Sequence, residues 1–373
     1  MTSSARVLVV NAGSSSLKLR LLAGDDRVLG SVDLAVSGSS YDGLDAALHE
    51  LTSTPDGAAS GVDAVGHRIV HGGRQYDRAV RVDSRVWTDL EALVDLAPLH
   101  QPKSLAAFEA VSALLPEVPA VACFDTAFHA TLPPAAATYP VPAAWREEHG
   151  VRRYGFHGLS HRYAARRAAE LLGRDPAGLR VVTCHLGAGA SLAAVHSGRS
   201  VDTTMGFTPL EGLMMATRSG SVDPGLVLWL QQHVGLSAAE IGDALEHRSG
   251  LLGLAGTADL REVTEKAGSD ETARAALDVY LHRLRAGIAA MTAALSGVDA
   301  VVFTGGVGEH SAVVRAEAAA GLGYLGLAVD PARNAAADGD TDITAAGAAV
   351  STLVVAARED LEIAREVRHV LAP

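Results

Sequence analysis

The 373-residue chain has few cysteines, few lysines and no basic run, and each shortage excludes a class of protein. Two cysteines, Cys123 and Cys184, are too few for a disulfide framework and fit a reducing compartment. Lysine occurs only at Lys18, Lys103 and Lys266, and none of these follows a glycine, which excludes the P-loop of nucleotide hydrolases. Because 43 acidic residues outnumber 31 basic ones, without a basic cluster, we exclude nucleic acid and anionic membrane surfaces as partners.

Long apolar runs are also missing. The apolar run near the start, residues 7–10, ends at Asn11, whereas a secretory signal needs about 7–15 apolar residues and a membrane span about 18. We therefore expect a soluble, cytoplasmic protein. A composition of 48% hydrophobic and 20% charged residues is typical of a globular protein. At roughly 100–200 residues per domain, the length allows two or three domains.

Short β-branched runs alternate with stretches rich in alanine and leucine, which predicts an α/β fold. Strands are predicted at residues 7–10, 17–21, 28–34, 120–124, 181–185, 199–204 and 300–304, with a further strand beginning at Leu192. Helices are predicted at residues 84–96, 102–115, 160–172, 277–295 and 359–371. Ser84 and Ser160 are expected to be the N-caps of two of these helices.

Turns rich in glycine and serine follow three of the predicted strands. Residues 11–16 and 185–191 each join a strand to a second strand, and these matched hairpins predict a duplicated domain. Glycine and serine also simply mark turns, which is the alternative for either hairpin alone. A third turn, residues 305–309, precedes a helix that starts near Ser311, a geometry that leaves backbone N–H groups for an anion or a ribose phosphate.

The duplication implies two domains. A proline-dense segment at residues 133–142 is the candidate boundary. We assign residues 1–130 to an N-terminal domain, joined by the C-terminal helix 360–373. Residues 131–359 form the C-terminal domain.

Two further patterns have alternative interpretations. Residues 321–326 match GxGxxG but follow an alanine-rich stretch instead of a strand, so we interpret them as a helix C-cap and turn. His67 and His71, like His157 and His161, are four residues apart, but neither pair has the HExxH pattern, and zinc is disfavoured. His157, just before a helix, either faces a ligand or is a structural histidine.

Polar residues near predicted strands are the strongest candidates for a site. Asn11, Asp125 and Glu359 each lie just beyond or near an apolar strand. In open α/β sheets such positions face the ligand crevice, and their oxygen atoms suit Mg²⁺. Arg68 and Arg218 lie in segments that contain glycine, which leaves room for a guanidinium to reach a carboxylate or phosphoryl group. A surface salt bridge is the alternative for either arginine.

Six motifs occur in order, at residues 11–18, 66–73, 124–129, 154–158, 205–212 and 303–309. Together they resemble the acetate kinase family, part of the superfamily that contains sugar kinases and actin. The resemblance implies two duplicated actin-like (ribonuclease H-like) α/β domains that flank a nucleotide cleft. It also implies direct, reversible phosphoryl transfer from ATP to acetate, giving acetyl phosphate and ADP, with Mg²⁺ or alternatively Mn²⁺. The family forms homodimers.

The resemblance assigns roles residue by residue. The catalytic residues would be Asp125, His157 and Arg218. The acetate subsite would comprise Arg68, Leu99 and Pro209, and the magnesium site Asn11 and Glu359. The nucleotide and its phosphates would contact Ser14, Ser16, Lys18, His185, Leu186, Gly187, Ala188, Gly189, Asp259, Leu260, Arg261, Gly306, Val307, Gly308, Glu309 and His310. Because acetate is already ionised at neutral pH, we expect Asp125 to position magnesium or substrate instead of moving a proton.

Several residues depart from the family pattern: Ala188, Ala216, His310 and Arg358, with Gln101 where asparagine is usual. We hypothesise that Ala188 and His310 weaken or alter nucleotide binding. A kinase for propionate or another short-chain acid is an alternative, since one methylene changes specificity by only about 1–3 kcal/mol. A second alternative is a nucleotide-sensing paralogue that has lost catalysis, which the retained catalytic residues oppose.

Overall fold

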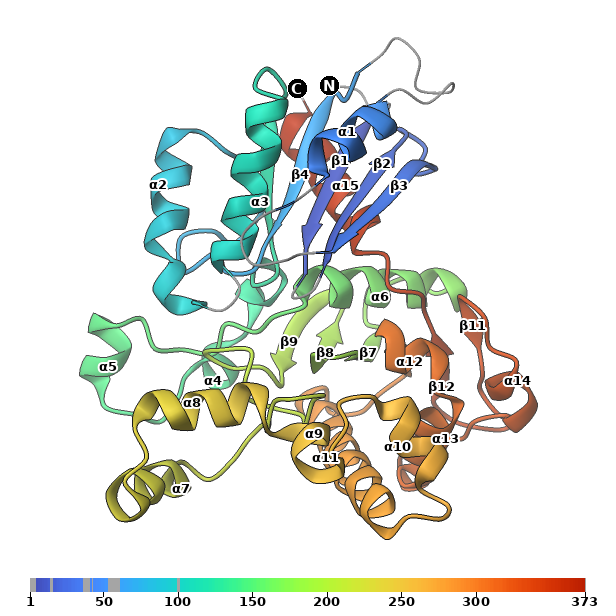
Figure 1. The fold of residues 1–373 in the computed structure, drawn as a ribbon. Helices are drawn as coiled ribbons and strands as arrows, with labels where there is room; N and C mark the ends of the chain where they lie inside the picture. The colour runs from blue at the N-terminus through green and yellow to red at the C-terminus, as the bar shows by residue number, and fades with distance from the viewer. Residues whose placement is uncertain are drawn as a thin grey trace. The chain divides into compact units, whose positions relative to one another are not determined.

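The structure, a computed structural model, describes residues 5–13, 16–35, 41, 43–52, 61–98 and 101–372. By its internal contacts the chain divides into two compact units (Figure 1). The first comprises Met1–Ala130 with Arg358–Pro373, and the second comprises Thr131–Ala357. Within the described ranges, no helix combines the length and apolar character that crossing a lipid bilayer requires.

The first unit is built on a six-stranded sheet in the order β3-β2-β1-β4-β6-β5. Its strands are β1 (Val7–Ala12), β2 (Ser16–Leu22), β3 (Val28–Ala35), β4 (Ala64–Ile69), β5 (Val80–Arg81) and β6 (Ala120–Phe124). Strands β1, β4 and β6 are parallel, whereas β2, β3 and β5 run antiparallel to their neighbours. The carboxyl ends of the parallel strands therefore share one edge of the sheet, where Asn11, Arg68 and Asp125 lie.

Helices cover both faces of this sheet. Helix α15 (Glu359–Leu371) packs on β1 and β4, and Gly66 permits this because a Cβ there would lie only 2.6 Å from the Ile363 side chain. On the other face, α1 (Leu44–Thr52) and α3 (Gln101–Leu114) bury one apolar cluster with β1 and β2. The remaining helices are α2 (Ser84–Ala92) and the 3-10 helices η1 (Val94–Leu96) and η2 (Ala127–Thr131).

The second unit repeats this arrangement. Its sheet has the order β11-β12-β10-β7-β8-β9, with β7 (Arg180–Leu186), β8 (Ala190–His196), β9 (Arg199–Thr203), β10 (Ala300–Thr304), β11 (Thr341–Asp342) and β12 (Ser351–Val354). Strands β7, β10 and β12 are parallel, and β8, β9 and β11 are antiparallel, in the same relative positions as in the first unit. The predicted α/β fold with two similarly built halves is confirmed.

Two long helices enclose the second sheet. Helix α6 (Gly158–Leu171) packs on β7 and β10, and α11 (Glu271–Ala294) packs on β8, where Gly287 allows contact with Leu192. The other helices are α4 (Pro134–Ala137), α5 (Ala143–Glu148), α7 (Pro224–Trp229), the π-helix η3 (Leu230–Val234), α8 (Ala238–His247), α9 (Gly250–Ala255), α10 (Leu260–Lys266), α12 (Gly305–His310), α13 (Ala312–Ala320), the 3-10 helix η4 (Gly323–Leu325) and α14 (Pro331–Ala335).

Both predicted serine N-caps are wrong. Helix α2 is capped by Asp83, one residue before Ser84, because the Asp83 carboxylate accepts from a backbone N–H of the first turn at 2.8 Å. Helix α6 begins at Gly158, and its N-cap position is His157, which has a left-handed backbone (φ 54°) and makes no side-chain cap. Ser160 lies inside the helix and contacts Nδ1 of His185 at 2.8 Å.

The glycine-rich residues after β10 form helix α12 and not the predicted turn. Arg315 is 1% exposed and donates to the carbonyl oxygens of Gly308 (2.9 Å) and Glu309 (2.6 Å), which satisfies the carboxyl end of this short helix. Ser311 caps the next helix, α13, near the predicted start. Residues 321–326 contain the C-cap of α13 and the turn η4, as predicted.

Candidate functional site

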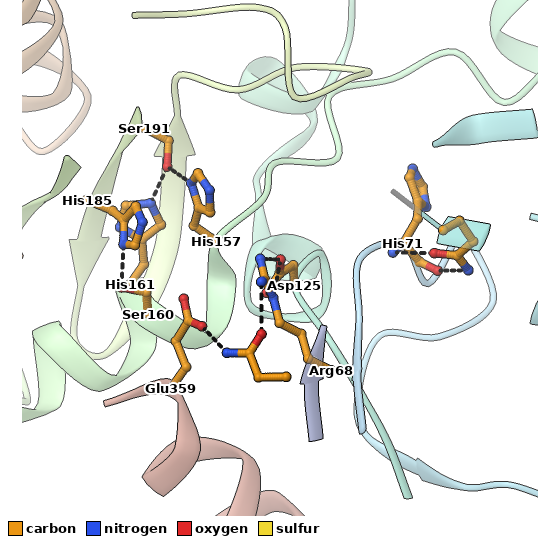
Figure 2. Close-up of polar contacts among 11 residues, drawn as sticks. Arg68, His71, Asp125, His157, Ser160, His161, His185, Ser191 and Glu359 are labelled. Carbon is orange, nitrogen blue, oxygen red and sulfur yellow. Dashed lines mark hydrogen bonds and ion pairs between the residues drawn. The ribbon is translucent and has the colours of Figure 1, made fainter. Parts of the chain in front are cut away.

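A buried ion pair lies at the edge of the first sheet. Asp125 follows β6, is 1% exposed, and accepts from Arg68 of β4, with Nη2–Oδ2 at 2.6 Å and Nε–Oδ2 at 3.0 Å (Figure 2). Nη1 of Arg68 donates to Oδ1 of Asn11 at 3.1 Å, and Nδ2 of Asn11 donates to Oε2 of Glu359 at 2.7 Å. We call these four residues the Arg68 cluster.

The guanidinium and the carboxylates of the Arg68 cluster shift one another's pKa values. Burial acts to lower the pKa of the Arg68 guanidinium, but Asp125 and Glu359 outweigh it and raise that pKa above its ordinary value. Burial raises the pKa of Asp125, and Arg68 opposes this shift. In the described part of the chain, the bonds to Asp125 and Asn11 leave one N–H on each of Nη1 and Nη2 of Arg68. Two such donors match the two oxygens of a carboxylate.

The same cluster offers hard oxygen donors for a metal. The Asn11 amide oxygen and the Glu359 carboxylate are ligand types that Mg²⁺ prefers. Among the described residues no group of three or more His, Cys, Asp or Glu side chains could hold an ion by itself. The donor set therefore fits Mg²⁺ that takes its other ligands from phosphate and water, as this ion commonly does.

Two histidines contact Ser191 in the second unit, and a third lies beside them (Figure 2). The Ser191 hydroxyl, on β8, lies 2.9 Å from Nδ1 of His157 and 2.7 Å from Nε2 of His161. Nδ1 of His161 lies 2.8 Å from the Thr183 hydroxyl on β7. The His185 ring stacks on His157 with 4.3 Å between ring centroids. We call these five residues the His157 cluster; its hydrogen bonds run from the sheet to the start of α6.

Arg218 and His157 approach the same point above Gly189, in the turn between β7 and β8. A Cβ atom on Gly189 would lie 3.3 Å from Nε2 of His157 and 3.6 Å from Nη1 of Arg218. Nε of Arg218 forms an ion pair with Oε2 of Glu246 on α8 at 3.0 Å, and both side chains are largely buried. Because Glu246 holds the Nε edge of the guanidinium, Nη1 is directed toward Gly189. Two nitrogen-rich side chains therefore converge on one glycine, a suitable arrangement for an anionic group.

A cavity of about 880 Å³ in the second unit contains much of the predicted nucleotide site. Its lining includes the predicted residues Gly187, Ala188, Asp259, Leu260, Arg261, Gly306, Val307 and His310. The volume falls within the range of small-molecule sites. Asp259 caps α10, and its Oδ2 lies 2.6 Å from Nη2 of Arg261. The cavity wall therefore contains this ion pair.

Other predicted nucleotide residues support the cavity from behind. Leu186 is fully buried, and Gly308 packs against the backbone of Phe303. Glu309 accepts from the backbone N–H of Ala357 at 3.0 Å. The burial of Leu186, the close backbone packing at Gly308 and the Glu309 hydrogen bond thus fix β7 and α12 beside the cavity.

The remaining predicted residues belong neither to these clusters nor to the cavity lining, or lie outside the described residues. Lys18 is exposed on β2, and the Ser16 carbonyl closes the first hairpin by accepting from the Gly13 N–H at 2.8 Å. The Pro209 carbonyl lies 3.4 Å from Nη1 of Arg218. Ser14 and Leu99 lie outside the described residues.

His67 and His71 are packed histidines in the first unit. His67 is fully buried against Phe108, with 4.4 Å between ring centroids, and burial lowers its pKa to about 3. Nδ1 of His71 accepts from the Gly73 N–H at 2.8 Å, and burial lowers its pKa to about 4. The Gln101 amide bonds both the N–H and the carbonyl of His71, at 3.1 and 3.2 Å. Gln101, which departs from the family pattern, thus stabilises the loop after β4.

Sequence reasoning missed Glu246 and the roles of Ser191, His161 and Thr183. Glu246 is one of several acidic residues on α8, and no motif distinguishes it. Ser191 does belong to the second hairpin that the sequence singled out, and His161 follows His157 by one helical turn. Those two positions are the signals from which the His157 cluster could have been predicted.

Comparisons with known proteins extend over nearly the whole chain. A model of the acetokinase family matches residues 30–365. An acetate kinase from Gloeobacter violaceus is 53% identical over 311 residues, which cover 82% of this chain and 76% of that protein. The crystal structure of Porphyromonas gingivalis acetate kinase has a TM-score of 0.89 at 36% identity, covering 98% of this chain and 100% of that one. A propionate kinase from Francisella tularensis subsp. tularensis also has a TM-score of 0.89, at 34% identity, covering 97% and 98%.

Proposed function

The chain belongs to the acetokinase family, and we propose that it transfers the terminal phosphoryl group of ATP reversibly to acetate, giving acetyl phosphate and ADP. The observation that carries this proposal is Arg68, a largely buried guanidinium held by Asp125 with one N–H remaining on each Nη. That fork suits the carboxylate of a small acid, or the matching end of acetyl phosphate. The two compact units would be the two domains of the family fold.

Transfer between two anions depends on alignment and on neutralising charge. Acetate is ionised at neutral pH and needs no base. Asp125, whose oxygens accept from Arg68, would therefore orient Arg68 and not move a proton. Arg218 and His157 would donate to the oxygens of the transferring phosphoryl group, where negative charge is concentrated. The cavity between α10 and α12 would hold the nucleoside.

Magnesium is part of the proposal. Asn11 and Glu359, joined by a 2.7 Å hydrogen bond, would hold the ion through their oxygen atoms. When bound, it would neutralise phosphate oxygens and bring the phosphates into line. Arg68 would keep the Asn11 amide oriented through its Nη1 contact.

The reaction is tested by trapping the acyl phosphate with hydroxylamine across a panel of acids and phosphoryl donors. We expect the highest kcat/KM with acetate and ATP, because the Arg68 fork suits a carboxylate, the cavity suits a nucleoside, and the acetate kinase from Gloeobacter violaceus is 53% identical to this chain. A higher kcat/KM with propionate would reassign the acid, which the similarity to a propionate kinase makes the main alternative.

Assays with GTP and pyrophosphate as phosphoryl donors test the hypothesis that Ala188 and His310 weaken or alter nucleotide binding. Ala188 and His310 both line the cavity, so altered donor preference would be traced to them. Micromolar KM for ATP would contradict weakened nucleotide binding. Nucleotide binding without turnover of any acid would identify a sensor and end the proposal of catalysis.

We also propose that two copies of this chain form a homodimer. Exposed apolar side chains gather on and beside α7 and η3, and we call them the α7 patch: Val222, Leu226, Leu228, Trp229 and Val234. Leu228 and Trp229 are more than half exposed, and exposed apolar side chains that gather on one segment can mark a contact with a partner. We also propose a cytoplasmic location, which fits the buried thiols of Cys123 and Cys184, since neither forms a disulfide.

Charging the α7 patch should separate the copies. We expect Leu228→Glu to convert a dimer into a monomer in analytical ultracentrifugation, because a carboxylate would have to be buried without a partner. Val28→Glu is the matched control, since Val28 is an exposed apolar residue of β3 in the other unit. A wild-type monomer, or a dimeric Leu228→Glu variant, would contradict the assignment.

A further inference from the structure

Ser191 couples two histidine rings through one hydroxyl group. It is fully buried, and its oxygen lies 2.9 Å from Nδ1 of His157 and 2.7 Å from Nε2 of His161. A serine hydroxyl has one proton to donate and lone pairs to accept with. If that proton is used within this pair of contacts, one ring accepts from Ser191 and the other donates to it. The protonation pattern of His161 therefore determines that of His157.

Thr183 gives this chain of hydrogen bonds its direction. The Thr183 hydroxyl lies 2.8 Å from Nδ1 of His161 and donates to the Ala193 carbonyl at 3.4 Å, and a carbonyl oxygen can only accept. Thr183 then accepts from Nδ1–H of His161. A neutral His161 carries its lone pair on Nε2, so it accepts from Ser191, and Ser191 accepts from Nδ1–H of His157. Of the two directions, only this one satisfies all four contacts at once.

We propose that Ser191 is a positioning residue that places the proton of neutral His157 on Nδ1 and thereby presents Nε2 over Gly189. The geometry agrees, since Nε2 of His157 is the ring nitrogen nearest to a Cβ built on Gly189. The role of this Nε2 atom in phosphoryl transfer depends on the proposed function. The proton arrangement itself rests only on the contacts within the second unit.

The surroundings of His157 give this arrangement a chemical consequence. His185 stacks on the ring from β7, Arg218 approaches from the loop between β9 and α7, and His161 lies one turn along α6. A neutral ring with Nδ1–H offers a lone pair at Nε2. To donate there to an anionic oxygen, His157 takes up a second proton, and Ser191 still accepts from Nδ1–H of the resulting imidazolium.

The tautomer can be read directly by NMR. We would label the full chain with ¹⁵N-histidine and record long-range ¹H–¹⁵N correlations at a pH where the ring is neutral, assigning His157 by comparison with His157→Gln. We expect a protonated Nδ1 and an unprotonated Nε2 for His157. In Ser191→Ala, the acceptor for Nδ1–H is gone, so we expect the signals to move to the Nε2–H form or to a mixture.

Two variants make the test specific. Ser160→Ala removes the other serine–histidine contact of this region, the 2.8 Å contact to His185, and we expect the His157 tautomer to remain unchanged. Ser191→Thr keeps a hydroxyl at the same position and should restore the wild-type pattern. Should Ser191→Ala fail to fold, the wild-type and Ser191→Thr spectra still decide the tautomer.

The kinetic expectation follows from the loss of one oriented hydrogen bond. Ser191→Ala should lower kcat about tenfold, with KM for acetate changed less than about twofold, and Ser191→Thr should recover most of kcat. An Nε2–H form in the wild type, or an unchanged tautomer in Ser191→Ala, would overturn the inference. Failure to find acyl phosphate in the hydroxylamine assay would overturn the proposed function and leave the NMR result standing.

Discussion

Replacing Arg218 by alanine is expected to lower kcat by about 10³–10⁵, with a much smaller rise in the KM for acetate. Nη1 of Arg218 and Nε2 of His157 approach the same point above Gly189, and Glu246 holds the guanidinium from its other edge. In the proposed function, Arg218 would act on charge at the transferring phosphoryl group, whereas Arg68 would bind acetate. Steady-state kinetics with acetate and ATP separate the two parameters.

Two further variants make the Arg218 result interpretable. Arg218→Lys keeps the positive charge but loses the planar fork, so it should recover only part of kcat. Arg248→Ala is the matched control, because Arg248 is an exposed arginine that pairs with Asp243 at 2.8 Å, and kcat should not change. A kcat for Arg218→Ala within tenfold of the wild type would remove Arg218 from the chemical step.

Replacing Asp125 by alanine is expected to impair both stability and acetate binding. Arg68 would remain buried without its bidentate partner, and breaking a buried ion pair in this way costs about 3–5 kcal/mol. The freed guanidinium would also lose the orientation that presents its two outer N–H groups. We expect a lower free energy of unfolding in denaturant titrations and at least a tenfold rise in the KM for acetate.

An exposed ion pair in the same unit provides the control. Asp33 pairs with Arg20 across β2 and β3 and its side chain is 52% exposed, so Asp33→Ala should change the free energy of unfolding by less than about 1 kcal/mol. Equal stability of the Asp125 and Asp33 variants would contradict a structural role for the Arg68–Asp125 pair. An unchanged KM for acetate would separate Asp125 from substrate binding.

Local sequence patterns were sufficient to predict the bounds of some strands and helices with buried apolar residues. Strands Ala120–Phe124 and Ala300–Thr304 and helix Glu359–Leu371 were predicted with the bounds that the structure has. Continuous apolar runs predict buried strands, and the 3.6-residue period predicts the helix. Ser160 shows the limit of such reasoning: serine favours N-caps, but its contact is His185, which is 25 residues away on β7.

The amino-acid sequence alone determined the α/β class, the duplication and most residues of the candidate site, because apolar periodicity and glycine-containing motifs are local properties of the chain. Only the tertiary structure decided what those residues touch. The pairing of Arg68 with Asp125, of Arg218 with Glu246, and of His157 with Ser191 depends on which strands and helices become neighbours. Hydrogen bonds and ion pairs act over a few ångströms in space, and spacing along the chain does not encode that distance.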